Sequence, residues 1–242
     1  MKLRIVLVAA LLGLAGLAQA EPVRPAALDA YLKALAGVEA ATAPVSLEPL
    51  MAAALAAQDA LMEIEGLGDQ AWLERLDEPA YGQLRAELRG FTLSRGFDVY
   101  AQPDAAFLDR LAQVHGGVMD REFFRLYRAY WSPELLPAYL SLGKRPTPCV
   151  RFGEGVVAKQ YEGWRGFARK YPQAYAGFTR QTLTDLEEVV ALGVCTCSDE
   201  ASVSRELRGF VKRFPDSPVA GKVRSRLVEL KENPTIRPVL CR

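Results

Sequence analysis

Four cysteines and one histidine are the residues of this chain best suited to covalent or metal chemistry. Cys195 and Cys197 are separated by one threonine, a spacing at which a thiol pair could exchange with a substrate disulfide. Such a pair needs surroundings that stabilise a thiolate, whereas Asp199 and Glu200 follow closely and bring negative charge. Because negative charge disfavours a thiolate, redox chemistry at this pair is the less favoured interpretation of the cysteines.

Disulfide bonds are the more direct interpretation. An even number of cysteines in an exported chain is typical of a disulfide framework, and four cysteines allow three pairings. A bond between Cys195 and Cys197 would close a small, strained ring, so we expect each of them to pair with Cys149 or Cys241. Each bond would close a loop of about 45 residues, which corresponds to roughly 4 kcal/mol in the chain-entropy model.

The first twenty residues predict export. Lys2 and Arg4 precede an apolar run over 5–17, and the small residues of Ala18-Gln19-Ala20 suit signal-peptidase cleavage. The run is shorter than the roughly 20 apolar residues that cross a bilayer, so it indicates a signal peptide over 1–20. We therefore expect a periplasmic or secreted protein that begins at Glu21, with no membrane span in the mature chain.

The histidine does not indicate a catalytic or metal site. His115 precedes Gly116-Gly117, a pair typical of a helix end, where the helix dipole favours an imidazole. It has no cysteine neighbour in the sequence, and neither a nucleophile elbow, a phosphate-binding loop nor a His-Glu-x-x-His motif occurs. We expect a structural histidine, no metal and no cofactor.

Paired carboxylates remain an alternative source of chemistry. A cell-envelope hydrolase of the peptidoglycan type needs a glutamate in an apolar pocket. Glu63 and Glu65 flank an isoleucine near a predicted helix end, and Glu122 and Glu134 flank an aromatic helix. Solvated positions on a helix are commoner for glutamate, and the Glu-Ser pair of lytic transglycosylases is absent. The catalytic glutamate of such an enzyme is therefore not identified.

Basic residues define the candidate partner-binding surface. Segment 143–180 holds eight basic and two acidic side chains, whereas 21–79 holds three basic and eleven acidic ones. The basic surface could bind an acidic envelope protein or an anionic envelope polymer through Lys144, Arg145, Arg151, Arg165, Arg169 and Lys170. Tyr161 and Trp164 could line it, but their helical spacing favours core packing. Nucleic acid is not expected, because the mature chain is near neutral.

Helices must position these residues, because apolar residues recur every three or four positions along most of the chain. Asp104 and Asp120 are predicted helix caps. Residues 90–101 alternate as a strand would, but we expect an irregular or kinked helix there, since no partner strand is visible. A Pro-rich basic loop over 143–148 is the expected domain boundary. The predicted helices span 25–38, 46–65, 69–76, 79–91, 104–115 and 120–131, with a short one after 132.

An internal repeat indicates how the C-terminal half is built. Residues 164–172 reappear as 207–215, with apolar matched to apolar and basic to basic; a weaker echo lies at 125–133. Pro172 and Pro215 would each end one helix and open a second. Two helix hairpins with a period near 43 residues are typical of a helical-repeat array.

One part of this repeat resembles a known family. Residues Phe214-Pro215-Asp216-Ser217-Pro218-Val219-Ala220, followed by Arg226-Leu227-Val228-Glu229-Leu230, are similar to the helix-turn-helix signature of bacterial periplasmic tetratricopeptide-like proteins. The resemblance covers the C-terminal half only, and it implies a protein-binding scaffold. The period exceeds the 34 residues usual for that family, and the cysteines are foreign to its pattern.

The sequence therefore predicts an all-α exported protein. Residues 21–142 would form an Ala-rich helical region that is acidic at its start, and 143–242 a disulfide-tied module of tetratricopeptide-like hairpins. The expected function is binding or scaffolding in the periplasm. The alternatives are a cell-envelope hydrolase and a thiol-redox protein that uses Cys195 and Cys197.

Overall fold

The computed structural model describes residues 22–64, 70–96, 99–132, 135, 150–192, 196 and 198–232. Within these ranges the chain is mostly helical, which confirms the predicted helical class, but it also contains a two-stranded sheet. The signal peptide predicted over 1–20, the loop 143–148 and all four cysteines lie outside the described residues. None of the described helices is both long and apolar enough to cross a membrane.

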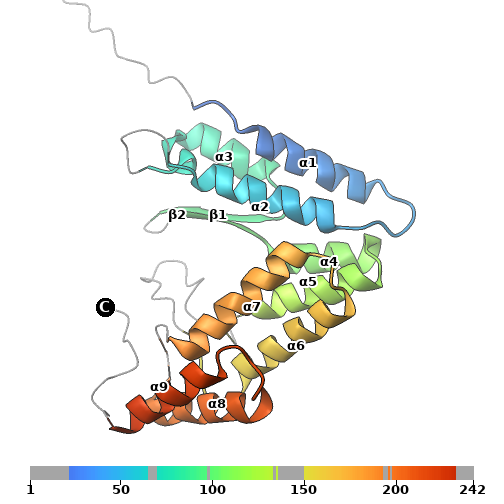
Figure 1. Cartoon of the computed structure of the whole chain (residues 1–242). Coiled ribbons are helices and arrows are strands. Elements are labelled where there is room, and N and C mark those ends of the chain that lie inside the picture. The colour runs from blue at the N-terminus through green and yellow to red at the C-terminus, as the bar shows by residue number, and fades with distance from the viewer. Residues whose placement is uncertain are drawn as a thin grey trace, which may run out of the picture.

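The elements lie on two sides of the sheet (Figure 1): the helices that precede it are on one side, and the helices that follow it, which form three consecutive hairpins, are on the other. In chain order they are α1 (Ala26–Glu39), α2 (Glu48–Met62), the 3-10 helix η1 (Trp72–Arg75), α3 (Glu78–Glu87), β1 (Phe91–Arg95), β2 (Val99–Pro103), α4 (Ala105–His115), α5 (Val118–Tyr130), α6 (Val156–Lys170), α7 (Ala176–Ala191), α8 (Glu200–Arg213) and α9 (Ala220–Glu232).

The prediction for residues 90–101 is wrong, because this stretch forms an antiparallel β-hairpin. Phe91 lies opposite Pro103, and Arg95 lies opposite Val99. The alternation of apolar residues is that of a strand, and the partner strand follows directly in the sequence. One face of the hairpin packs on α1 and α2: the Phe91 ring meets Tyr31 edge-on at 5.0 Å, and Ala101 is buried.

Aspartate side chains cap the starts of α3, α4 and α8. Asp104 accepts hydrogen bonds from the main chain of Ala106 and Phe107, which confirms its predicted role as a cap. The prediction for Asp120 is wrong, because α5 begins two residues earlier with Gly117 at its N-cap. Asp120 instead accepts the Gly117 N–H from the third helical position, as the acidic member of a capping box does.

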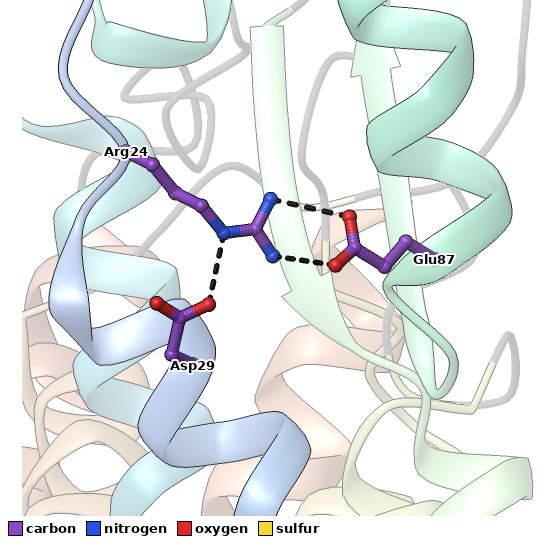
Figure 2. Close-up of polar contacts among 3 residues, drawn as sticks. All are labelled: Arg24, Asp29 and Glu87. Atoms are coloured by element: carbon purple, nitrogen blue, oxygen red, sulfur yellow. Dashed lines mark hydrogen bonds and ion pairs between the residues drawn. The ribbon is translucent and has the colours of Figure 1, made fainter.

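A cluster of ion pairs holds the N-terminal segment against α3 (Figure 2). The Arg24 guanidinium donates to both oxygens of Glu87, at 2.9 and 3.2 Å, and its Nε donates to Asp29 at 2.9 Å. The Trp72 indole N–H also donates to the carbonyl of Val23. Planar, two-pronged pairing with one carboxylate fixes orientation better than a single surface pair does. These contacts therefore hold the chain against the folded protein from residue 23 onward.

The two C-terminal hairpins, α6–α7 and α8–α9, use equivalent residues in equivalent ways. Trp164 and Phe167 of α6 are fully buried, as are Leu207 and Phe210 at the matching positions of α8. The repeated proline turns separate the helices of each hairpin, although α7 and α9 begin a few residues after the prolines. The sequence match therefore reflects a shared buried helix face.

A further repeat position forms the contact between successive hairpins. Gly163 of α6 lies against Leu126 of α5, where an added Cβ would come within 2.8 Å of the leucine methyl group. The matching position in α8 is Glu206, whose carboxylate reaches the start of α6. The residue at this position therefore faces the preceding hairpin in both units.

One hydrophobic core joins the described parts of the chain on both sides of the predicted boundary. Phe123 of α5 stacks on Tyr175 at 3.7 Å and meets Trp164 of α6 edge-on at 5.6 Å. The residues before 133 and those after 149 thus pack as one body through their aromatic side chains.

Candidate functional site

The predicted basic surface is partly neutralised inside the chain. Arg165 pairs with Asp216 at 3.0 Å, and Lys170 pairs with Glu122 at 2.7 Å. These hydrogen bonds raise the pKa of both basic groups, and the bond from Arg165 lowers the pKa of the Asp216 carboxyl. Two of the predicted binding residues therefore help to hold neighbouring elements together.

The remaining basic residues of that surface differ in their surroundings. Arg151 lies 4.0 Å from Glu154, and Arg169 is exposed on α6 with no ion pair to another described residue. Lys144 and Arg145 lie outside the described residues. Arg169 is thus the member of the set whose charge is most available to a partner.

The aromatic residues near this surface belong to the core, as their spacing predicts. Trp164 is fully buried and Tyr161 is 2 % exposed. The Tyr161 hydroxyl donates to Glu187 at 2.6 Å, and desolvation together with this acidic partner raises the pKa of the phenol. The Arg165 guanidinium lies 5.5 Å from the centre of the Tyr161 ring. The aromatic side chains are therefore not available to line a binding surface.

His115 has the structural position that the sequence predicts. It is the last residue of α4, and its carbonyl accepts a hydrogen bond from Val45 at 2.9 Å. Val45 and Gly116 form a short parallel bridge that joins the α1–α2 connection to the start of α5. Among the described residues, no nucleophilic side chain forms a hydrogen bond with the His115 imidazole.

The glutamates proposed for a hydrolase do not share a site in the described structure. Glu63 is exposed just after α2, and Glu122 is engaged by Lys170 and by the Tyr171 hydroxyl. Glu65 and Glu134 lie outside the described residues. The described residues also contain no group of three or more His, Cys, Asp or Glu side chains that could hold a metal ion.

Two buried carboxylates have structural roles: Glu206, for which the sequence predicted no role, and Asp120, which was predicted only as a helix cap. Glu206 is 3 % exposed and accepts three main-chain N–H groups, from Gly153 and Gly155 at 2.9 and 2.7 Å and from Ala158 at 3.2 Å. It therefore caps α6 from a different helix. The sequence does contain a signal for this role, because Glu206 lies on the helix face of α8 that otherwise carries apolar residues, between Val203 and Phe210.

Asp120 is the second such carboxylate, and it lies where three segments meet. It is 2 % exposed and accepts the Leu47 N–H, the Gly117 N–H and the Tyr175 hydroxyl. Tyr175 has a left-handed backbone with φ of 49°, and its N–H donates to Glu48 at 2.7 Å. Hydrogen bonds satisfy this carboxylate, so it is part of the scaffold rather than an acid poised for catalysis.

A groove between α3 and β1 is a concave surface of the described residues that could hold a ligand. Its volume is about 600 Å³, and it is lined by Glu78, Tyr81 and Arg85 of α3 and by the strand from Phe91 to Gly96. The three α3 residues lie one helical turn or two apart and so share one face. This groove could not be expected from the sequence, because an irregular or kinked helix was predicted over 90–101, where β1 lies.

Arginines set the electrostatics of the groove. Arg95 lies 4.5 Å from the centre of the Tyr81 ring and bonds to Glu78 and to the carbonyls of Leu76 and Asp77, so it closes one end. Arg85 lies 5.8 Å from the same ring, is exposed and makes no ion pair with a described residue. The groove therefore presents one unpaired positive charge beside an aromatic ring.

A second pocket lies on the other side of the hairpin. It has a volume of about 320 Å³ and lies between Thr92 and Gln102 of the sheet, the start of α4, and Arg128 and Trp131 at the end of α5. The Arg128 guanidinium pairs with Asp109 at 3.0 Å, so its charge is already compensated. This pocket is therefore a weaker candidate for an anionic ligand than the groove.

Comparison with protein-family models, with curated proteins and with solved structures finds no match for this chain. Its function must therefore be inferred from the chemistry and geometry of its own residues.

Proposed function

We propose that this protein is an exported helical binding or scaffold protein of the periplasm, with a tetratricopeptide-like C-terminal module. The observation that carries this proposal is the stacking of successive helix hairpins through one equivalent position, Gly163 in one unit and Glu206 in the next. Arrays of this kind expose extended surfaces, which other proteins of similar build use for binding.

The described residues also favour binding over catalysis. The buried carboxylates of Asp120 and Glu206 accept hydrogen bonds from the main chain, and the glutamates proposed for a hydrolase are exposed, ion-paired or outside the described residues. The thiol-redox alternative rests on Cys195 and Cys197, which also lie outside them. We therefore propose an envelope protein or an anionic envelope polymer as the partner, with Arg169 as the most available cation of the predicted surface.

Export and partner capture test this proposal separately. The full chain should be expressed with its own N-terminus in a Gram-negative host, then fractionated and sequenced; a mature N-terminus at Glu21 in the periplasm is expected. Crosslinking in intact cells should recover a specific complex that Arg169→Glu weakens. The matched control is Arg125→Glu, on the exposed side of α5. A cytoplasmic full-length chain would contradict the proposed compartment, and absence of any complex would contradict the binding function.

A further inference from the structure

The outer edge of β1 is a main-chain surface that could take another strand. The sheet in the described parts of the chain has two strands, and the Asp104 N–H donates to the Gly90 carbonyl at 2.8 Å. This bond fixes the register, because hydrogen-bonded pairs alternate along an antiparallel ladder. Gly90 and every second residue after it, Thr92 and Ser94, therefore turn their main-chain groups toward β2.

The residues between them turn their main-chain groups the other way. Phe91, Leu93 and Arg95 stand in the non-bonded pairs of the ladder, opposite Pro103, Ala101 and Val99. Pro103 agrees with this register, because a proline has no N–H to donate and occurs at such positions. The N–H and C=O groups of Phe91, Leu93 and Arg95 thus point along the sheet and away from β2.

This edge forms one wall of the groove described above. The strand carries neither a proline nor a bulge, which are common devices for blocking an open edge. The other wall is α3, which is joined to β1 by the short turn at Leu88–Gly90 and keeps its Tyr81 ring toward the groove. A groove between a helix and a strand edge is the geometry that binds extended peptides by strand addition.

The charges of the groove select the kind of peptide. Glu78 and Arg95 compensate each other, which leaves the Arg85 guanidinium beside Tyr81 as the unpaired charge among the described lining residues. An acidic side chain or a terminal carboxylate would pair with it, and an arginine in a partly desolvated groove suits a carboxylate well. A basic peptide would meet like charge there.

We infer that the groove between α3 and β1 binds an extended acidic peptide segment of another protein, which adds to the outer edge of β1. This inference rests on the proposed binding function and names its site and the chemistry of its partner. Affinity comes from main-chain hydrogen bonds to Phe91, Leu93 and Arg95, and selectivity comes from Arg85.

A phage-displayed library of random decapeptides, selected on the full mature chain, is the probe for this site. Recovered peptides should alternate β-branched and acidic residues, and Arg85→Glu should weaken their binding at least tenfold. The control is Arg110→Glu, an exposed arginine on α4, which should leave the affinity unchanged. Recovery of basic peptides, equal binding to Arg85→Glu, or no recovered peptide would overturn the inference.

Amide hydrogen exchange on the same complex locates the peptide. Bound peptide should slow exchange at Phe91, Leu93 and Arg95 and leave Thr92 unchanged, because the Thr92 N–H already faces β2. Protection around Arg169 instead would overturn the inference while leaving the proposed binding function in place. Sedimentation of the free protein is a further test: a dimer that Arg85→Glu dissociates would overturn the inference, because a second copy of the chain would then occupy the edge.

Discussion

The Tyr175 hydroxyl donates a 2.5 Å hydrogen bond to the Asp120 carboxylate in the interior of the protein. Asp120 also accepts the main-chain N–H groups of Leu47 and Gly117. The contact thus joins the start of α2, the start of α5 and the turn before α7. These three donors take the place of the water that would otherwise hydrate the buried carboxylate.

Replacement of Tyr175 by phenylalanine removes one of these donors. We expect Tyr175→Phe to lower the free energy of unfolding by roughly 1.5–3 kcal/mol, since the lost bond is to a charged, buried acceptor. Urea denaturation measures this change. The control is Tyr171→Phe, whose half-exposed hydroxyl makes a 3.3 Å contact with Glu122 and whose loss should cost about 0.5 kcal/mol or less. Equal effects of the two variants would contradict the role of the Tyr175–Asp120 hydrogen bond in joining these three segments.

The stability of the protein should fall at alkaline pH. Burial raises the pKa of Tyr31, Tyr127 and Tyr175, and for Tyr175 the bond to Asp120 raises it further. The folded state therefore keeps these protons when the unfolded chain, with phenols of pKa about 10, begins to lose them. The stabilisation is complete below that pH and is lost progressively as the pH rises above it.

Urea denaturation at pH 8 to 11 tests this dependence, and phenolate absorbance of the folded protein gives an independent measure. We expect the free energy of unfolding to decrease above about pH 10, and the buried tyrosines to ionise only as the protein unfolds. Tyr175→Phe should make the decrease shallower. Ordinary titration of every tyrosine in the folded protein would contradict the burial of these three hydroxyl groups.

The helices were predictable because their apolar residues recur with helical spacing over ten residues or more, as in α5 and α6. The β-hairpin was not, because its strands are five residues long and all of β1 is half-buried on both faces. Phe91 and Leu93 alternate as a strand requires, but the deciding fact, pairing with the segment directly after them, is a tertiary contact. The groove depends on that pairing, so it could not be predicted either.

The basic surface shows a different limit of the sequence. The net charge of a segment can be counted, but the partner of each charge depends on which elements meet. Arg165 and Asp216 are 51 residues apart and come together only because α6 lies against the α8–α9 turn. Glu206 could have been noticed, since a charged residue at an apolar helix position needs a partner for burial.

Glu206 should be essential for the contact between the two C-terminal hairpins. Glu206→Gln keeps the shape of the side chain but replaces one acceptor oxygen by an N–H₂ group, which cannot accept the main-chain N–H groups that face it. We expect a loss of roughly 1.5–3 kcal/mol in the free energy of unfolding. Glu188→Gln, at an exposed position of α7, is the matched control and should change it by less than about 0.5 kcal/mol.

Hydrogen exchange distinguishes a local from a global effect of this change. Exchange at Gly153 and Gly155 should accelerate more than exchange in α1 and α2, because these amides lose their acceptor directly. Uniform acceleration throughout the chain would show that Glu206 contributes only to global stability.

Two described residues that neighbour three of the cysteines in sequence lie side by side. Val150 and Thr196 form a parallel bridge, and the Thr196 hydroxyl donates to the Val150 carbonyl at 3.3 Å. Val150 follows Cys149 in the sequence, and Thr196 separates Cys195 from Cys197. We therefore expect Cys149 to be bonded to Cys195 or Cys197, and the other cysteine of that pair to Cys241.

Mass spectrometry of the unreduced, exported protein tests this pairing. Proteolysis should leave the peptides that contain Cys149, Cys195 and Cys241 linked, and a thiol assay should find no free cysteine. Cys241→Ser should free one thiol at 195 or 197 without releasing Cys149. A bond between Cys149 and Cys241, or a labile bond between Cys195 and Cys197, would contradict the pairing; the second result would also favour the redox alternative.

Three helix glycines give a test of how successive hairpins approach each other. A Cβ on Gly166 or Gly209, the repeated pair, would meet nothing within 4 Å, whereas a Cβ on Gly163 would come within 2.8 Å of a Leu126 methyl group. Gly166→Ala and Gly209→Ala should raise the free energy of unfolding by roughly 0.5–1 kcal/mol through helix propensity and chain entropy. Gly163→Ala should gain less or become destabilising, because the leucine must move. Thermal or urea unfolding compares the three variants directly, and an equal gain at Gly163 would mean that α5 and α6 are not in close contact there.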